Sequence, residues 1–229
     1  MRSGKKSGSE AALYGRRRFL VHAALAGLGL PIAAAAQQRP AAGDEVHIFA
    51  LGDSLTAGFG LPRELGFVPQ LEAHLRRHGV PARLTNAGVS GDTAAQGLQR
   101  LAWTLDGLAR TPDLAIVALG ANDMLRGLPV AQTRAALDAI LAELGRRQIK
   151  MLLAGMIAAP NLGQDYARAY NPMFSELARA HGAAFHPFFL EGVAGDRTLN
   201  QADGIHPNFP GVKRMVSTIT PRVVEVLRQ

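Results

Sequence analysis

The sequence predicts an α/β protein with three layers, in which helices cover both faces of a five-stranded parallel sheet in a single domain. From residue 44 onward, short apolar runs alternate with longer helical patterns, which is typical of parallel strands joined by right-handed crossovers. The run LAIVALG (residues 114–120) is apolar throughout, as expected of a central strand covered on both faces. The length of 229 residues suits one domain with a substantial core.

The amino-terminal half begins with a predicted strand at Val46–Leu51, an apolar run. Residues 66–78 are predicted to be a helix because apolar side chains recur there every four residues. Residues 83–88 form a weaker strand candidate, and Thr93–Leu108 places leucines at helical spacing. Trp103 is expected to anchor this helix in the core.

The carboxyl-terminal half continues the alternation. The pattern predicts a helix at Val130–Arg147, a strand at residues 149–156, a helix at residues 166–182 and a short strand at residues 183–189. Val212–Leu227 is predicted to be a closing helix, although a proline lies near its middle.

Residues 1–36 have the order of an export signal. A basic stretch ends in Arg16–Leu20 (RRRFL), which resembles a twin-arginine signal, and a mildly apolar stretch with small residues follows. We expect cleavage near Ala36, a short linker at residues 37–45 and a periplasmic or secreted protein with no stable membrane anchor. The general secretion route stays open, and a permanent anchor is the weaker alternative because glycine, proline and histidine interrupt the apolar stretch.

The net charge of +7 is concentrated in this leader. Residues 1–36 hold six of the 25 Lys and Arg residues and one of the 18 acidic residues, so the remainder has a net charge of +2. A nucleic-acid partner is therefore not expected. The chain has no cysteine, which excludes disulfides, a cysteine nucleophile and the commonest soft metal ligand.

Four clusters of small and polar residues follow predicted strands or precede the last helix. They are Gly52–Ser54, Asn86–Gly88, Gly120–Asp123 and Asp203–Pro207. Because parallel strands end at one edge of the sheet, the first three clusters are expected to meet there. The fourth lies in a loop that could return to the same edge.

These clusters contain the parts of a serine hydrolase. In a turn, Asp203 can accept a hydrogen bond from Nδ1 of His206, which leaves Nε2 free as a base for the Ser54 hydroxyl. The side-chain amide of Asn122 and the backbone N–H groups of Gly88 and Ser54 could stabilise an oxyanion. Taken singly, each residue also has a structural explanation as a helix cap, a turn residue or an incidental histidine.

The segments GDSLTAGFG, NAGVSGDT, GAND and DGIHPN occur in the order and at the spacing of the four blocks of the SGNH (GDSL-type) hydrolases. The resemblance covers residues 46–229, the expected hydrolase domain. GANDMLRGLP and NLGQDYARAYNPMFSELA are similar to a subgroup of periplasmic bacterial arylesterases, thioesterases and lysophospholipases. The resemblance implies a flavodoxin-like sandwich that needs no metal or organic cofactor.

The resemblance also implies a role for each site residue. Ser54 would be the nucleophile, His206 the base and Asp203 its orienting partner, while Gly88 and Asn122 would complete the oxyanion hole with the Ser54 N–H. The expected function is a serine esterase that cleaves carboxylic esters, with thioesters and lysophospholipids as further candidate substrates, through an acyl-enzyme.

The expected partner is a small-molecule ester or a lipid. The loops after Asn122 and after Met156 are expected to wall an apolar acyl pocket, to which the following residues would contribute: Met124, Leu125, Leu128 and Ile157.

Three other functions remain open. One is a carbohydrate (acetyl) esterase on the same fold, and another is a binding module without catalysis. The third is a metal-dependent hydrolase, for which these residues could supply the ligands: Asp53, Asn122, Asp123, Asp203 and His206. If they hold no metal, Asp53 and Asp123 are expected to support turns and backbone N–H groups.

Overall fold

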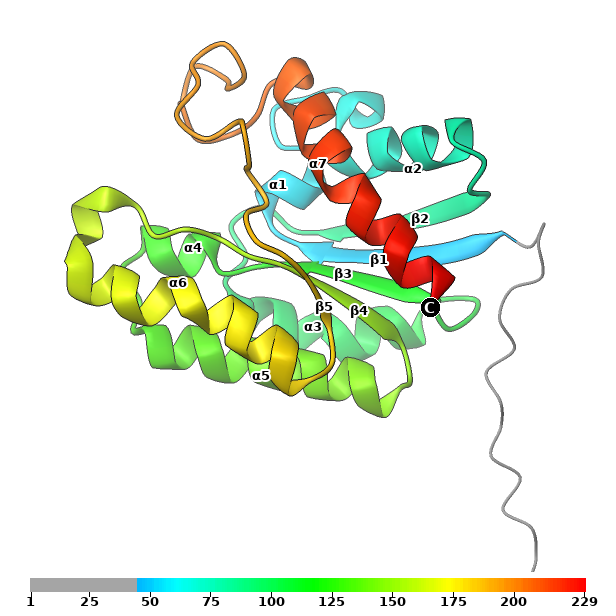
Figure 1. Cartoon of the computed structure of the whole chain (residues 1–229), viewed down its shortest axis with the longest axis horizontal. Coiled ribbons are helices and arrows are strands. Elements are labelled where there is room, and N and C mark those ends of the chain that lie inside the picture. The colour runs from blue at the N-terminus through cyan, green and yellow to red at the C-terminus, as the bar shows by residue number, and fades with distance from the viewer. Residues whose placement is uncertain (1–44) are drawn as a thin grey trace, which may run out of the picture. The chain divides into compact units, whose positions relative to one another are not determined.

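The computed structural model describes residues 45–229 and contains one five-stranded parallel sheet in the order β2-β1-β3-β4-β5 (Figure 1). The strands are β1 (Val46–Gly52), β2 (Ala82–Gly88), β3 (Leu114–Ala118), β4 (Lys150–Ala154) and β5 (Ala184–His186). All neighbouring pairs are parallel. The prediction of a single α/β domain with five parallel strands is confirmed. The expected leader and residues 37–44 of the expected linker lie outside the described residues.

Helices cover both faces of this sheet, so the three-layer arrangement is also confirmed (Figure 1). One face carries α2 (Phe67–Arg77) and α7 (Phe209–Arg228), and the other carries α3 (Ala94–Asp106), α5 (Val130–Arg146) and α6 (Gly163–Ala180). The shorter elements are α1 (Ser54–Ala57), α4 (Ala121–Leu125) and the 3₁₀ turns η1 (Arg63–Leu65) and η2 (Pro160–Leu162).

Capping side chains set where the helices beside the site begin. The Thr93 hydroxyl accepts the N–H of Gln96, whose side chain accepts the Thr93 N–H in return, and this capping box starts α3. The Asn208 side chain accepts the N–H of Gly211, so α7 starts at Phe209 instead of the predicted Val212.

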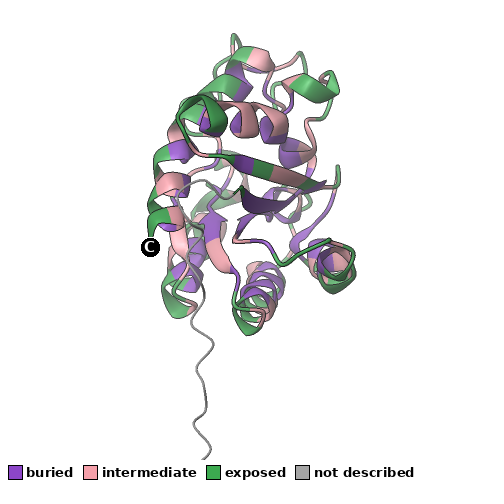
Figure 2. Cartoon of the chain, turned by 90° about the vertical axis from the view of Figure 1, so that its right-hand side faces the viewer, coloured by how far each residue is buried: buried purple, intermediate pink, exposed green. Residues whose placement is uncertain are grey.

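The central strands provide the rigid base of the site. Every residue of β1 and β3 is buried, whereas the edge strand β2 is only partly buried. The helices turn their buried residues inward (Figure 2). The chain moves from β1 to β2 in one direction and later to β3 on the other side. In open α/β sheets, ligands bind at such a reversal, outside the carboxyl ends of the strands.

One expectation about the core is wrong. Trp103 is 79% exposed on the outer face of α3, because the inner face of this helix is formed by other residues, among them Leu101 and Leu105. Within residues 45–229, none of the helices combines the length and the apolar character needed to cross a membrane.

Candidate active site

Ser54 is the first residue of α1 and directly follows the capping residue. The Asp53 carboxylate caps the helix by accepting the N–H of Leu55 at 3.0 Å, so the Ser54 hydroxyl is not used for capping. Gly52 permits the sharp exit from β1, since a Cβ at this position would lie 2.0 Å from Oγ1 of Thr56. The turn therefore ends the strand with Gly52 and Asp53 and leaves the serine side chain available.

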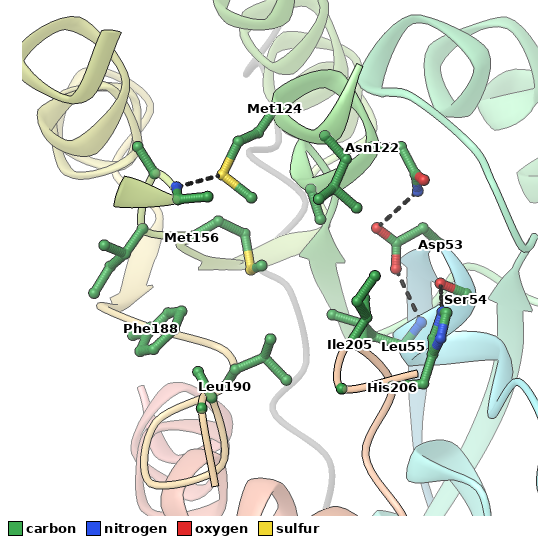
Figure 3. Close-up of a pocket in the computed structure, with 18 of the residues that line it drawn as sticks. Asp53, Ser54, Leu55, Asn122, Met124, Met156, Phe188, Leu190, Ile205 and His206 are labelled. Atoms are coloured by element: carbon green, nitrogen blue, oxygen red, sulfur yellow. Dashed lines mark hydrogen bonds between the residues drawn. The ribbon is translucent and has the colours of Figure 1, made fainter. Parts of the chain in front are cut away.

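His206 connects Ser54 to Asp203. Its Nε2 lies 2.9 Å from the Ser54 Oγ (Figure 3). Its Nδ1 lies 2.7 Å from Oδ2 of Asp203. Asp203 also accepts the backbone N–H groups of His206 and Ile205 through Oδ1. Because the His206 backbone and side chain and the Ile205 backbone all donate to this carboxylate, the pKa of Asp203 falls to about 2. An ionised carboxylate at Nδ1 favours the tautomer in which Nε2 accepts the serine proton.

Asn122 comes to the same place from α4. Its Nδ2 donates to the backbone carbonyl of Asp92 at 3.0 Å and lies 3.4 Å from Oδ2 of Asp53. Both neighbours are acceptors, which fixes the side-chain NH₂ group on the side facing Asp53 and Ser54 (Figure 3). The structure thus brings together Ser54, Asn122, Asp203 and His206.

Gly88, in contrast, is not presented to the reacting atoms. Its N–H already donates to Oδ1 of Asn86 at 2.9 Å, so it is not free to bind an oxyanion. Packing explains why this residue is a glycine, since a Cβ would lie 2.4 Å from the backbone nitrogen of Ala57 in α1. The geometry therefore does not support the expected role of Gly88 as an oxyanion donor.

An apolar pocket of about 480 Å³ extends from Ser54 and His206 (Figure 3). The expected residues Met124, Leu125 and Ile157 line it, whereas Leu128 does not. A third wall comes from the connection between β5 and α7, and it consists of Phe188, Leu190, Ala194, Gly195, Asn200 and the loop that carries His206. This wall was not predicted, because a long connection has no periodicity to mark its inward-facing residues.

Comparison with known proteins identifies the family. The family model described as the GDSL-like lipase/acylhydrolase family matches residues 50–214. Esterase TesA of Pseudomonas aeruginosa is 36% identical over 180 residues, which cover 79% of this chain and 89% of TesA. Thioesterase 1/protease 1/lysophospholipase L1 of Escherichia coli is 35% identical over 170 residues, which cover 74% of this chain and 78% of that protein.

The crystal structure of AlinE4, an SGNH-hydrolase family esterase, matches with a TM-score of 0.69 at 48% identity, covering 80% of this chain and 97% of AlinE4. The chain belongs to the GDSL-like lipase/acylhydrolase family. The predicted SGNH resemblance and the predicted class, a carboxylic ester hydrolase of the serine esterase type, are confirmed.

Arg100 supports the site of this hydrolase and was not predicted from the sequence. From α3 its Nε bonds Oδ2 of Asp92 at 2.6 Å, and its Nη2 donates to the carbonyl of Gly52 at 3.0 Å. The side chain is 19% exposed. It joins the end of β1 to the loop whose Asp92 carbonyl holds Asn122. Only the folded chain brings these segments together, so no local pattern indicates the role.

The acidic residues beside the site act on backbone groups, as expected. Asp123 accepts the N–H of Ala94 at 2.8 Å and the Thr133 hydroxyl at 3.1 Å, and so holds α3 and α5 against α4. Both carboxylate oxygens of Asp123 are used in these two contacts. Residues 45–229 contain no group of at least three His, Cys, Asp or Glu side chains that could hold a metal ion.

The Asp53 carboxyl next to Ser54 is buried. Removal from water raises the pKa of this carboxyl to about 6, although the Leu55 N–H and His206 oppose the shift. A carboxyl with a raised pKa stabilises the fold fully below its unfolded pKa of 3.8, and this contribution is lost as the pH rises through about 6.

We therefore expect Asp53→Asn to increase the free energy of unfolding at pH 8 by about 3 kcal/mol, and to have little effect at pH 4. The asparagine oxygen can still accept the Leu55 N–H as a helix cap, and only the long 3.4 Å contact from Asn122 is lost. Urea unfolding of both proteins at the two pH values measures the difference. Asp165→Asn, at a side chain that is 96% exposed, is the control. A variant no more stable than the wild type at pH 8 would contradict the expectation.

Proposed function

We propose that this esterase hydrolyses its substrates through an acyl-enzyme formed on Ser54, with His206 as the general base and Asp203 as its orienting partner. The observation that carries the proposal is the continuous hydrogen-bonded series from Ser54 Oγ through His206 to Asp203 at the mouth of an apolar pocket. A serine hydroxyl becomes an effective nucleophile when an adjacent base accepts its proton.

The reaction would proceed in two halves. Ser54 Oγ attacks the carbonyl carbon while its proton passes to Nε2 of His206, which gives a tetrahedral oxyanion. The oxyanion collapses, the bond to the leaving alcohol or thiol breaks, and the leaving group takes the proton from His206. Water then attacks the acyl-enzyme with its proton passing to His206, and Ser54 leaves with that proton as the acid is released.

The oxyanion would be stabilised by donors on three segments: the start of α1, the start of α4 and the turn between β2 and α3. The Ser54 N–H and Asn122 Nδ2 lie beside the nucleophile, and the Asn122 hydrogen on the long 3.4 Å contact to Asp53 would turn to the oxyanion. We assign the third donor to the N–H of Gly91 instead of Gly88. Gly91 has a φ of 88°, and its N–H has no hydrogen-bond partner among the described residues. The carbonyl of the following residue, Asp92, accepts a hydrogen bond from Asn122 Nδ2. The turn at Gly91 therefore lies next to the side-chain amide of Asn122.

Asn122→Ala is expected to lower kcat by about 10²- to 10³-fold, because one oxyanion donor is lost. The KM for the same ester should change little, since the interaction forms mainly in the transition state. Steady-state kinetics with p-nitrophenyl butyrate measure both constants. Asn86→Ala is the matched control, because this side-chain amide lies near the end of β2 and its oxygen accepts the Gly88 N–H. Equal kcat values for the two variants would remove Asn122 from the oxyanion hole.

The pocket supports an apolar acyl group as the part of the substrate bound next to Ser54. Its walls carry Met124, Met156, Phe188 and Leu190, and an acetyl group alone would leave most of the volume of about 480 Å³ unfilled. We therefore favour esters, thioesters or lysophospholipids with a longer acyl chain over acetylated carbohydrates.

The proposal is tested with purified protein and p-nitrophenyl esters of graded chain length. We expect hydrolysis, faster with butyrate or longer chains than with acetate. A serine-directed phosphonate should stop the reaction and label Ser54, as located by mass spectrometry, whereas a chelator should have no effect. Labelling at another serine, or loss of activity with the chelator alone, would overturn the proposal.

We also propose that the protein is exported and acts in the periplasm or outside the cell. The basic, apolar and small-residue order of residues 1–36 supports this, together with the concentration of positive charge in that segment.

A further inference from the structure

The loop that carries Asp203 and His206 is closed on itself. The N–H of Gln201 donates to the carbonyl of His206 at 2.7 Å, and the N–H of Asn208 donates to the carbonyl of Leu199 at 3.0 Å. The hydrogen bonds between Asp203 and His206 also lie within this loop, and the residues between Gln201 and His206 are exposed. These bonds keep the shape of the loop, but they do not determine where it lies relative to Ser54.

The side chain of Gln201 makes that connection. Its Nε2 donates to the carbonyl of Phe59, on the segment that follows the nucleophile, at 2.7 Å and to the carbonyl of Pro207 at 3.0 Å. Both amide hydrogens are therefore used, one on the segment that follows Ser54 and one on the loop that carries His206. The Phe59 ring in turn lies against the His206 ring, with centroids 4.5 Å apart, although 49% of Phe59 is exposed.

Gly60 leaves the space that Gln201 occupies. Its φ is 73°, a conformation that favours glycine, and a Cβ at this position would lie 2.2 Å from Oε1 of Gln201. The backbone after α1 is thus shaped to accept this side chain next to Phe59. The contact is a specific fit between segments far apart in the sequence.

We propose that Gln201 is a positioning residue that holds the His206 loop at hydrogen-bonding distance from Ser54. Within residues 45–229, two hydrogen bonds join residues 201–206 to residues 54–60: the Gln201 bond to Phe59, and the bond between His206 and Ser54 itself. The inference rests on the proposed reaction of Ser54 with His206. A displacement of a reacting group by about 1 Å can cost about 10²-fold in rate, so the Gln201 bond should matter for kcat.

Gln201→Met keeps the length of the side chain and removes both donors. We expect kcat for p-nitrophenyl butyrate to fall by about 10- to 100-fold with little change in KM, because the acyl pocket keeps its walls. The matched control is Gln70→Met, which removes a glutamine whose Nε2 donates to the carbonyl of Glu64 at 2.8 Å, away from His206. This control should retain the wild-type kcat.

A double-mutant cycle separates positioning from a general effect on the fold. If Gln201 acts through His206, Gln201→Met should cause no further loss in a His206→Ala background. A further loss of the same factor there, or a wild-type kcat in the single variant, would overturn the inference. Gly60→Ala is an independent second variant, since its Cβ displaces Gln201, and it should also lower kcat.

Activity retained by Ser54→Ala would instead overturn the proposed function. The two failures are therefore distinguishable.

Discussion

Ser54→Ala is expected to lower kcat for p-nitrophenyl butyrate by about 10⁴-fold or more. Without the hydroxyl no acyl-enzyme can form, and only the oxyanion donors and the pocket remain to assist attack by water. His206 loses one hydrogen-bond partner but keeps Asp203, so the melting temperature should stay close to that of the wild type. A pre-steady-state burst of p-nitrophenol, expected where deacylation limits turnover, should disappear with the acyl-enzyme.

Ser217→Ala provides the matched control. Ser217 lies exposed on α7, and its hydroxyl donates to the carbonyl of Arg214 at 2.7 Å. It should retain full activity and full labelling by the phosphonate, whereas Ser54→Ala should lose both. A Ser54→Ala enzyme that still turns over within tenfold of the wild type would require another nucleophile.

Asp203→Asn is expected to lower kcat/KM by about 10⁴-fold while the loop keeps its shape. The asparagine oxygen can still accept the N–H groups of Ile205 and His206, as Asp203 does through Oδ1. Its NH₂ group would, however, face Nδ1 of His206 and favour the tautomer with a proton on Nε2. That tautomer cannot accept the proton of Ser54.

The matched control for this loss is Asp138→Asn, because Asp138 also pairs with a histidine, Nε2 of His181, at 2.7 Å on the surface. It should leave kcat/KM unchanged. Because the pKa of Asp203 is about 2, the carboxylate stays ionised from pH 4 upward. The acidic limb of the wild-type rate profile should therefore not report Asp203. An Asp203→Asn enzyme with near wild-type activity would show that His206 does not need this partner.

The sheet could be predicted because burial leaves a strong pattern in the sequence. The strands β1 and β3 are buried throughout, and apart from His47 in β1 they are apolar. The long helices carry regular apolar positions. The helices α1 and α4 span only one turn, which is too short for periodicity to show.

The site could be predicted only in part, for a different reason. Ser54 and Asn122 end up together because parallel strands finish at one edge, which follows from topology. Asp203 and His206 reach that edge on the connection between β5 and α7. The error at Gly88 arises because sequence does not show which backbone N–H groups are already bonded, here by Asn86. The contacts of Gln201 and Arg100 join distant segments, so they become visible only in the folded chain.

The connection between β5 and α7 both lines the pocket and carries His206. This limits how the substrate preference of the enzyme can change. Residues 188–195 of this connection line the pocket, and residues 203–206 carry His206, the proposed base. A longer or shorter connection would change the room for the acyl chain and displace the base at the same time. The opposite wall at residues 156–160 carries none of the reacting groups. Inherited changes in chain-length preference should therefore accumulate in that wall, where selection can alter the substrate without altering the chemistry.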